Sequence, residues 1–290
     1  MVKISSVDGN RQWLDGGSMF GNAPRAVWEK WAAPDDKGRI ELACRALLIE
    51  TDQHKILCET GIGAFFEPKM AERFGVQTPD KHLLLENLTA LGVHEDDIDF
   101  VILSHLHFDH AGGLLPTYQE IESGQDRLLF PKAQYVVGKE AFERAEQPHF
   151  RDKASFIPGL VDKLKESGRL IVINGETHPD LPSEISFFES HGHTPGQLHT
   201  VFKGPAKTIV FAGDMIPGEA WVHLPITMGY DRYPELLIDE KKTFYEKALD
   251  PSWMVFFTHD PRISGASVEK NDKGRYYAAG SVETFNRFEI

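Results

Sequence analysis

The sequence predicts an α/β fold, because segments with helical periodicity alternate with short apolar runs that are typical of buried strands. Leucines recur at helical spacing within residues 81–91, and Gly92 follows as a signal for the helix end. The next segment, VHEDDIDFVILSH, ends in an apolar run of strand length. The chain has 290 residues, of which 41% are hydrophobic, enough to fill one large core. We therefore expect residues 1–290 to form a single domain, on which residues 1–39 pack as an N-terminal arm.

The other elements follow from the same signals. ELACRALLIETDQHKILCET predicts two strands joined by a turn near Asp52 and Gln53, a hairpin that we expect to begin the first sheet. RLIVIN predicts another strand, and VETFNRFEI predicts a closing strand. Helices are predicted at 138–146, 159–167 and 235–249, and strands at 185–188, 208–212 and 253–257.

Seven side chains that can bind metal form the most informative pattern in the chain. Four of them lie in the block SHLHFDHAGG, directly after the strand-like run. Three imidazoles and a carboxylate at a strand end are too many polar groups for ordinary hydrogen bonding, whereas divalent cations satisfy them directly. The other three each come just after a later strand-like run, so we expect all of them to meet at a sheet edge. The seven are His105, His107, Asp109, His110, His193, Asp214 and His259.

The order of residues within the block suggests two metals. His105 and His107 alternate along an extended segment, so both can face one cation, while Asp109 and His110 lie beyond the bend and can face a second. Gly112 and Gly113 permit the tight backbone turn that the packed loop requires.

This HxHxDH block, followed by a lone His, an Asp and a final His, resembles the metallo-β-lactamase superfamily over about residues 40–260. The resemblance implies the αββα sandwich, in which two mixed β-sheets lie face to face with helices outside and the site lies along one edge. It also implies a ligand set. His105, His107 and His193 would bind the first metal, Asp109, His110 and His259 the second, and Asp214 would bridge the two.

A dinuclear site of this kind implies a metal-dependent hydrolase. Two cations about 3.5–4 Å apart make a bridging hydroxide nucleophilic near neutral pH. We expect Asp109, besides binding metal, to act as the catalytic group that carries a proton from the attacking water to the leaving alkoxide. Zinc is the expected metal, and manganese, iron and cobalt also suit these ligands.

A finer resemblance concerns the substrate. GGSMFG, the hairpin, and HLPITMGYDRYP ahead of FFTHDP resemble the branch that contains N-acyl homoserine lactone lactonases and methyl parathion hydrolase. It implies that the enzyme opens a lactone ring, with phosphotriesters and other esters or thioesters as the alternative. A glyoxalase II-like activity is less favoured, because few residues follow His259.

Two positions depart from the family pattern. Pro217 stands where the small lactonases carry a tyrosine, three residues after the bridging aspartate, so the phenol that polarises the carbonyl must come from elsewhere or be absent. Glu59 stands where the superfamily often has aspartate, which leaves the support of the metal ligands there open.

Two segments should determine what the pocket accepts. The arm contains several large aromatic residues, which must pack in the core, in a dimer contact or in the pocket wall. Residues 218–237 lie between Asp214 and His259 and are expected to cover the metals. We expect these segments to form an elongated apolar groove, with Tyr230 as the candidate replacement for the missing tyrosine. The expected substrate-binding residues are Phe20, Trp221, His223, Met228 and Tyr230.

Composition restricts the partners. A net charge of −13 argues against nucleic acid or an anionic membrane, since either would require a basic surface. The start MVKISSVDGN lacks the basic and apolar regions of a signal peptide, and no apolar run is long enough to span a membrane, so we expect a cytoplasmic protein. Cys44 and Cys58 are then expected to be buried thiols. The expected partner is a small neutral ester or lactone, and a homodimer is left open.

Overall fold

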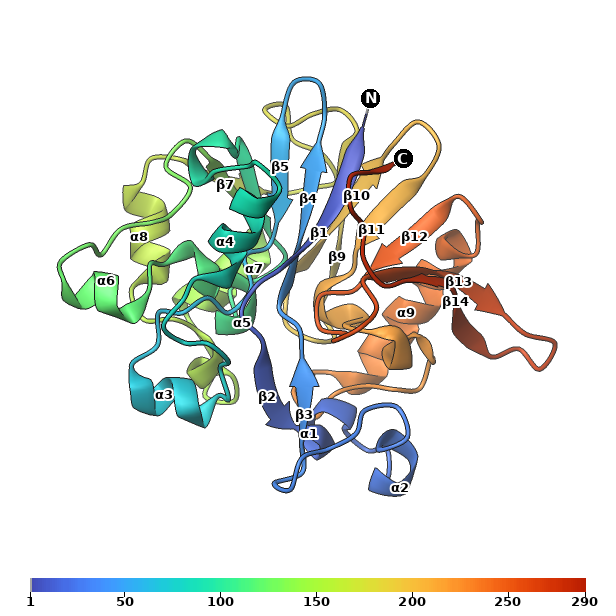
Figure 1. Cartoon of the computed structure of the whole chain (residues 1–290). Helices are drawn as coiled ribbons and strands as arrows, with labels where there is room; N and C mark the ends of the chain where they lie inside the picture. The colour runs from blue at the N-terminus through green and yellow to red at the C-terminus, as the bar shows by residue number, and fades with distance from the viewer. Residues whose placement is uncertain (1) are drawn as a thin grey trace.

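Two large mixed β-sheets, with helices on their outer sides, make up the computed structural model, which describes residues 2–290 (Figure 1). This arrangement confirms the predicted αββα sandwich. The seven strands of the first sheet lie in the order β15-β1-β4-β5-β6-β7-β8. Their bounds are β1 Lys3–Asp8, β4 Arg45–Glu50, β5 Lys55–Cys58, β6 Phe100–Leu103, β7 Gln134–Gly138, β8 Leu170–Ile173 and β15 Phe288–Glu289.

The second sheet has six strands in the order β14-β13-β12-β11-β10-β9. Strand β11 is parallel to β12, and β10 is antiparallel to both β11 and β9. Strands β9, β11 and β12 therefore run in the same direction, and their carboxyl ends lie at one edge. The bounds are β9 Ile185–Ser190, β10 Gln197–Lys203, β11 Thr208–Phe211, β12 Trp253–Phe256, β13 Gly265–Lys270 and β14 Tyr276–Val282.

The four longer helices confirm the periodicity in the sequence to within two residues at each end. They are α4 Leu83–Ala90, α7 Lys139–Glu146, α8 Leu160–Glu166 and α9 Pro234–Ala248. Helices α4 and α8 lie on the side of the first sheet and α9 on the side of the second (Figure 1). The short helices are α1 Gly16–Phe20, α2 Arg25–Trp28, α3 Pro68–Arg73, α5 Phe108–Ala111 and α6 Tyr118–Glu122.

Strand β6 shows how the layers are held together. Ile102 packs in the apolar cluster between the two sheets, where Phe211 and Phe256 meet it from the second sheet. Its neighbours Val101 and Leu103 point the other way, into the cluster beneath the helices of the first sheet. Because both faces are buried, the strand is a continuous apolar run in the sequence.

The N-terminal segment differs from the expected arm. The hairpin of β4 and β5 is present, but it does not begin the first sheet, because β1 precedes it and pairs with β4 from Lys3↔Glu50 to Asp8↔Arg45. KISSVD gives a weak strand signal, since serines occupy two of its central positions. The rest of the segment contains α1, α2 and strand β2 (Gln12–Asp15), which pairs with β3 (Arg39–Leu42) in a separate two-stranded ribbon. The predicted closing strand is reduced to β15, which pairs with β1.

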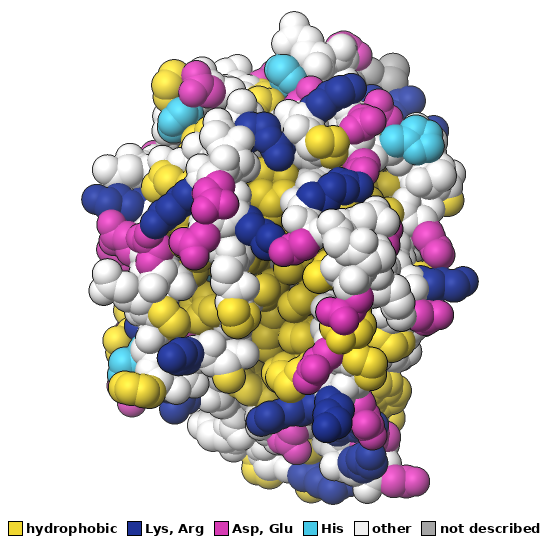
Figure 2. All heavy atoms as spheres, turned by 90° about the vertical axis from the view of Figure 1, so that its left-hand side faces the viewer, with side chains coloured by type: hydrophobic (Ala, Val, Ile, Leu, Met, Phe, Trp, Pro, Cys, Tyr) yellow, Lys and Arg dark blue, Asp and Glu magenta, His cyan; other side chains and the backbone are white. Residues whose placement is uncertain are grey.

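The surface and the thiols agree with the composition. Basic and acidic side chains are mixed on the face shown in Figure 2, and hydrophobic side chains line a hollow in it. Cys44 and Cys58 are buried and unpaired, as predicted. Within residues 2–290, no helix has the length and hydropathy needed to cross a membrane.

Candidate metal centre

The seven predicted metal ligands converge at the edge where the carboxyl ends of β6, β9, β11 and β12 meet. His105 and His107 lie in the loop after β6, and the short helix α5 presents Asp109 and His110. The other three come from loops of the second sheet, so the site joins both sheets. The imidazoles and Asp214 are buried, and the Asp109 side chain is 14% exposed.

The two glycines that end the ligand block are required for a different reason from the expected tight backbone turn. Gly112 and Gly113 have ordinary negative φ angles, but a Cβ atom on either would lie about 2 Å from a backbone oxygen of Ile62 or Thr60. These glycines are therefore needed for close approach of two backbones, which brings the loop after β5 against the ligand block.

The side chains form two groups that share one carboxylate. In the first, His107 Nδ1 lies 2.9 Å from His105 Nε2 and 3.3 Å from His193 Nε2. The second comprises Asp109, His110 and His259, whose two Nε2 atoms are 3.2 Å apart. Asp214 lies between the groups, with Oδ2 3.1 Å from His193 Nε2 and Oδ1 3.2 Å from His259 Nε2.

These residues fit a pair of divalent cations. Zn–N bonds of about 2.0–2.1 Å in tetrahedral geometry place ligand nitrogens about 3.3 Å apart, close to the separations in both groups. Asp214 Oδ1 is buried and has no well-aligned hydrogen bond, although His259 Nε2 lies 3.2 Å away; a cation between the two atoms would satisfy both. The histidine and carboxylate donors suit zinc, manganese, iron and cobalt alike.

Four of the five imidazoles are oriented through the nitrogen that faces away from the cluster. Ser104 Oγ contacts His105 Nδ1 at 2.9 Å, and Ala43 O lies 2.7 Å from His259 Nδ1. Glu59 Oε2 lies 2.8 Å from His110 Nδ1, and Asp231 Oδ1 lies 2.9 Å from His193 Nδ1. Such contacts fix both the tautomer and the ring orientation of a metal ligand.

Glu59, which stands where the superfamily often has aspartate, does support a candidate metal ligand, His110. Its side chain is fully buried and accepts hydrogen bonds from Ser104 Oγ and, at 3.2 Å, from Thr258 Oγ1, in addition to its contact with His110. Its backbone has a φ of 64°, which is strained for a residue other than glycine. The strained turn aims this carboxylate at the outer side of the second metal group.

Charge is distributed unevenly between the groups. Burial, together with the neighbouring imidazoles, lowers the pKa of His105 and His107 well below the usual range, so both rings are neutral ligands. Burial also acts to lower the pKa of His110, but the carboxylates of Glu59, Asp214 and Asp109 raise it well above the usual range. Although burial would raise the pKa of Asp214, the surrounding imidazoles hold it well below the usual range, and the carboxylate stays ionised.

A cavity of about 590 Å³ opens onto the cluster. Met228 and Tyr230 line it, as predicted, together with apolar side chains that include Met19 and Phe108. Burial raises the pKa of Tyr230, so its hydroxyl is protonated and able to donate at neutral pH. The cavity thus combines candidate metal ligands, an apolar wall, one phenol and the side chains of Arg39, Arg73 and Arg151.

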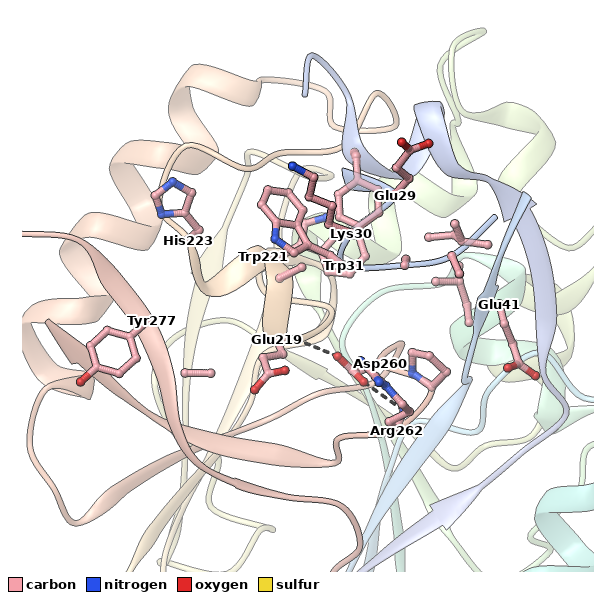
Figure 3. Close-up of a pocket in the computed structure, with 18 of the residues that line it drawn as sticks. Glu29, Lys30, Trp31, Glu41, Glu219, Trp221, His223, Asp260, Arg262 and Tyr277 are labelled. Atoms are coloured by element: carbon pink, nitrogen blue, oxygen red, sulfur yellow. Dashed lines mark hydrogen bonds between the residues drawn. The ribbon is translucent and has the colours of Figure 1, made fainter. Parts of the chain in front are cut away.

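The other three predicted substrate residues lie elsewhere. Phe20, Trp221 and His223 line a separate cavity of about 980 Å³ beside α2 and the β13–β14 hairpin. Figure 3 shows Trp221 and His223 in this cavity. None of the three residues lines the cavity over the candidate metal ligands. The Phe20 ring stacks on Trp221 at 4.5 Å and on Trp28 at 5.6 Å. This stacking holds the arm against residues 219–222, and both Phe20 and Trp221 are buried in the core beside the second sheet.

Three residues at the site carry no signal in the sequence that would have revealed them. Gln12 Nε2 donates a hydrogen bond of 2.9 Å to Asp109 Oδ2, although β2 is a short strand far from the ligand block in the chain. Asp231 supports His193, and Arg151 joins the cavity wall by donating to Gly229 O at 2.7 Å. Only the fold brings these residues to the metal ligands.

The fold and the cluster of ligands define a metal-dependent hydrolase. The model of the metallo-beta-lactamase superfamily matches residues 39–119 and 128–259, and the chain belongs to this superfamily. An N-acyl homoserine lactonase from Bacillus sp. is 26% identical over 241 residues, which cover 76% of this chain and 82% of the relative.

Two solved structures share the architecture. A probable metal-dependent hydrolase from Staphylococcus aureus is 25% identical, with a TM-score of 0.83 and coverage of 97% of this chain and 98% of that chain. AidC, a dizinc quorum-quenching lactonase in complex with its product, is 21% identical, with a TM-score of 0.74 and coverage of 97% and 95%. At 21% identity, the similarity to AidC supports the fold alone.

Proposed function

We propose that this protein is a dinuclear hydrolase that opens the ring of a neutral lactone bearing an acyl chain, as in N-acyl homoserine lactones. The observation that carries the proposal is the convergence of seven candidate ligands, in two groups sharing Asp214, at the base of a cavity that has both apolar and charged walls. The lactonase activity of the curated relatives supports the choice of substrate.

We propose that His105, His107 and His193 hold one cation, that Asp109, His110 and His259 hold the other, and that Asp214 contacts both. Bound cations would supply Lewis-acid polarisation of the substrate carbonyl and would lower the pKa of water, so that hydroxide is available near neutral pH. We take zinc to be the native metal, with manganese, iron and cobalt as the other candidates.

The chain's own residues would then bind the substrate and move the proton. Asp109 is the most exposed of the ligands and faces the cavity, and Gln12 holds one of its oxygens. We propose that it takes the proton of the attacking water and delivers it to the leaving alkoxide. Tyr230 would donate a hydrogen bond to the carbonyl oxygen, in the role that Pro217 cannot fill, while Met228 contacts the acyl chain.

The cellular setting forms a further part of the proposal. We propose that residues 1–290 act as one domain in the cytoplasm, where the two unpaired thiols stay reduced. We also propose that the arm, whose Trp31 is 37% exposed, contributes to a homodimer contact. Light scattering on the purified protein measures the mass of the particle and tests that contact.

One purified sample tests both the metals and the substrate. Elemental analysis after loading with excess zinc and desalting should give about two equivalents, and fewer than about 1.5 contradicts the dinuclear site. The same sample is then assayed on acyl lactones, on a paraoxon-like phosphotriester and on a thioester. The proposal expects the highest kcat/KM for a lactone, and a phosphotriester that is turned over faster than every lactone refutes it.

A further inference from the structure

Two adjacent residues of α9 contact the two loops that meet at His193. One is Lys241, whose side chain is fully buried. Its ammonium donates to the backbone oxygens of Trp221 at 2.5 Å, His223 at 3.3 Å and Ile226 at 3.0 Å. Among residues 2–290, no carboxylate lies within ion-pair distance of this ammonium, so backbone oxygens alone compensate its charge.

The loop that Lys241 holds continues into the support of His193. Met228 N donates to Asp231 Oδ2 at 2.6 Å, and the other oxygen of Asp231 contacts His193 Nδ1 at 2.9 Å. Asp231 is fully buried. The position of its carboxylate therefore depends on the backbone just before it, which Lys241 anchors at Ile226.

Glu240 holds the other side of the same contact. Its Oε1 accepts from His191 N at 2.7 Å, and its Oε2 accepts from Gly192 N at 3.0 Å. The helix approaches this loop so closely that a Cβ on Gly192 would lie 2.5 Å from the Cα of Leu237. The backbone that carries His193 is thus bound directly to α9.

A core lysine without a carboxylate partner needs an explanation. Burying an ammonium costs several kcal/mol, and an apolar side chain of similar length in its place is often neutral or stabilising. The three backbone bonds give the loop one defined geometry, which an apolar contact would not specify. Conformational precision at His193 accounts for keeping a lysine at this core position.

We propose that Glu240 and Lys241 are a positioning pair for the first metal group: Glu240 fixes the backbone of His193, Lys241 fixes the backbone of Asp231, and together they set the orientation of the His193 ring. This inference rests on the proposed function, in which His193 binds a metal. Neither residue lines the cavity, so both would act through His193 and not on the substrate.

The test uses Lys241→Met and Glu240→Gln, with Lys242→Met and Glu246→Gln as controls at exposed positions of the same helix. Zinc affinity is measured by competition with a chromophoric chelator, and circular dichroism with thermal unfolding confirms that each variant is folded. Glu240→Gln keeps the shape of the side chain and serves as the milder variant if Lys241→Met does not fold.

One of the two zinc equivalents should bind about 10- to 100-fold more weakly in both variants, the range typical for lost partners of metal ligands. The other equivalent and both controls should match the wild type, and excess zinc should restore turnover. Folded variants that bind both equivalents as tightly as the wild type, or lose both equally, overturn the positioning pair. A wild type that binds fewer than two zinc ions refutes the dinuclear site itself, and the inference with it.

Discussion

Trp221→Ala distinguishes the observed packing from the groove that the sequence suggests. Trp221 is buried against Phe20 at 4.5 Å, and its Nε1 donates to Met19 O at 3.1 Å. Truncating a buried tryptophan costs about 3–5 kcal/mol, and losing the stacked pair adds about 0.5–1.5 kcal/mol. Trp221→Ala should therefore unfold at a much lower urea concentration.

The same variant should leave substrate selectivity unchanged, because Trp221 does not line the cavity over the metal ligands. The assay is kcat/KM for a series of lactones of increasing chain length, at a temperature where the variant is folded. Met228→Ala is the matched comparison, since Met228 lines that cavity and should lose part of the gain of about 0.8 kcal/mol per buried methylene. The reasoning fails if Trp221→Ala is as stable as the wild type but no longer discriminates by chain length.

Three more predictions follow from the site. Asp214→Ala should lower turnover by more than about 100-fold while the fold persists, because two ligand groups lose their shared carboxylate; wild-type activity would show that another group bridges. Glu59→Gln should weaken zinc binding because it disturbs His110, but the loss of affinity should be smaller than in Asp214→Ala. Competition with a chromophoric chelator measures both affinities. Burial lowers the pKa of Lys241 from 10.5 to about 7, so the unfolded chain binds the extra proton between these values. Over that pH range, the free energy of unfolding of the wild type should rise relative to Lys241→Met, by at most about 1.4 kcal/mol per pH unit, and urea titrations at pH 6 and pH 9 should show the difference.

Local signals in the sequence predicted the helices and the side chains that cluster as candidate metal ligands. The spacing of the leucines within residues 81–91 predicts one apolar helix face without any knowledge of the rest of the fold. Helix α4 occupies this segment in the structure. The ligand block could also be recognised from local sequence. Its members are close in the chain, and they follow a strand whose two faces are both buried. The later ligands could be assigned because strands that run in one direction bring their carboxyl ends to one edge.

The faces of the irregular segments could not be predicted. Trp221 and Met228 are both apolar residues of one segment, but Trp221 packs on the arm and Met228 lines the metal cavity. Without a regular period, a loop gives no indication of which side each residue presents. Strand β1 was missed for a related reason, because its pairing with β4 outweighs its weak local preference.

By itself the sequence determined the superfamily, the sandwich and the seven side chains that cluster at the sheet edge, because these depend on residue types at fixed short spacings and at strand ends. Only the tertiary structure decided which residues support them. Gln12, Glu240 and Lys241 lie far along the chain from the ligands they stabilise, and their contacts exist only after the sheets and α9 have packed. Such long-range contacts depend on the whole fold, because a polar side chain has no local preference for a partner that is remote in sequence.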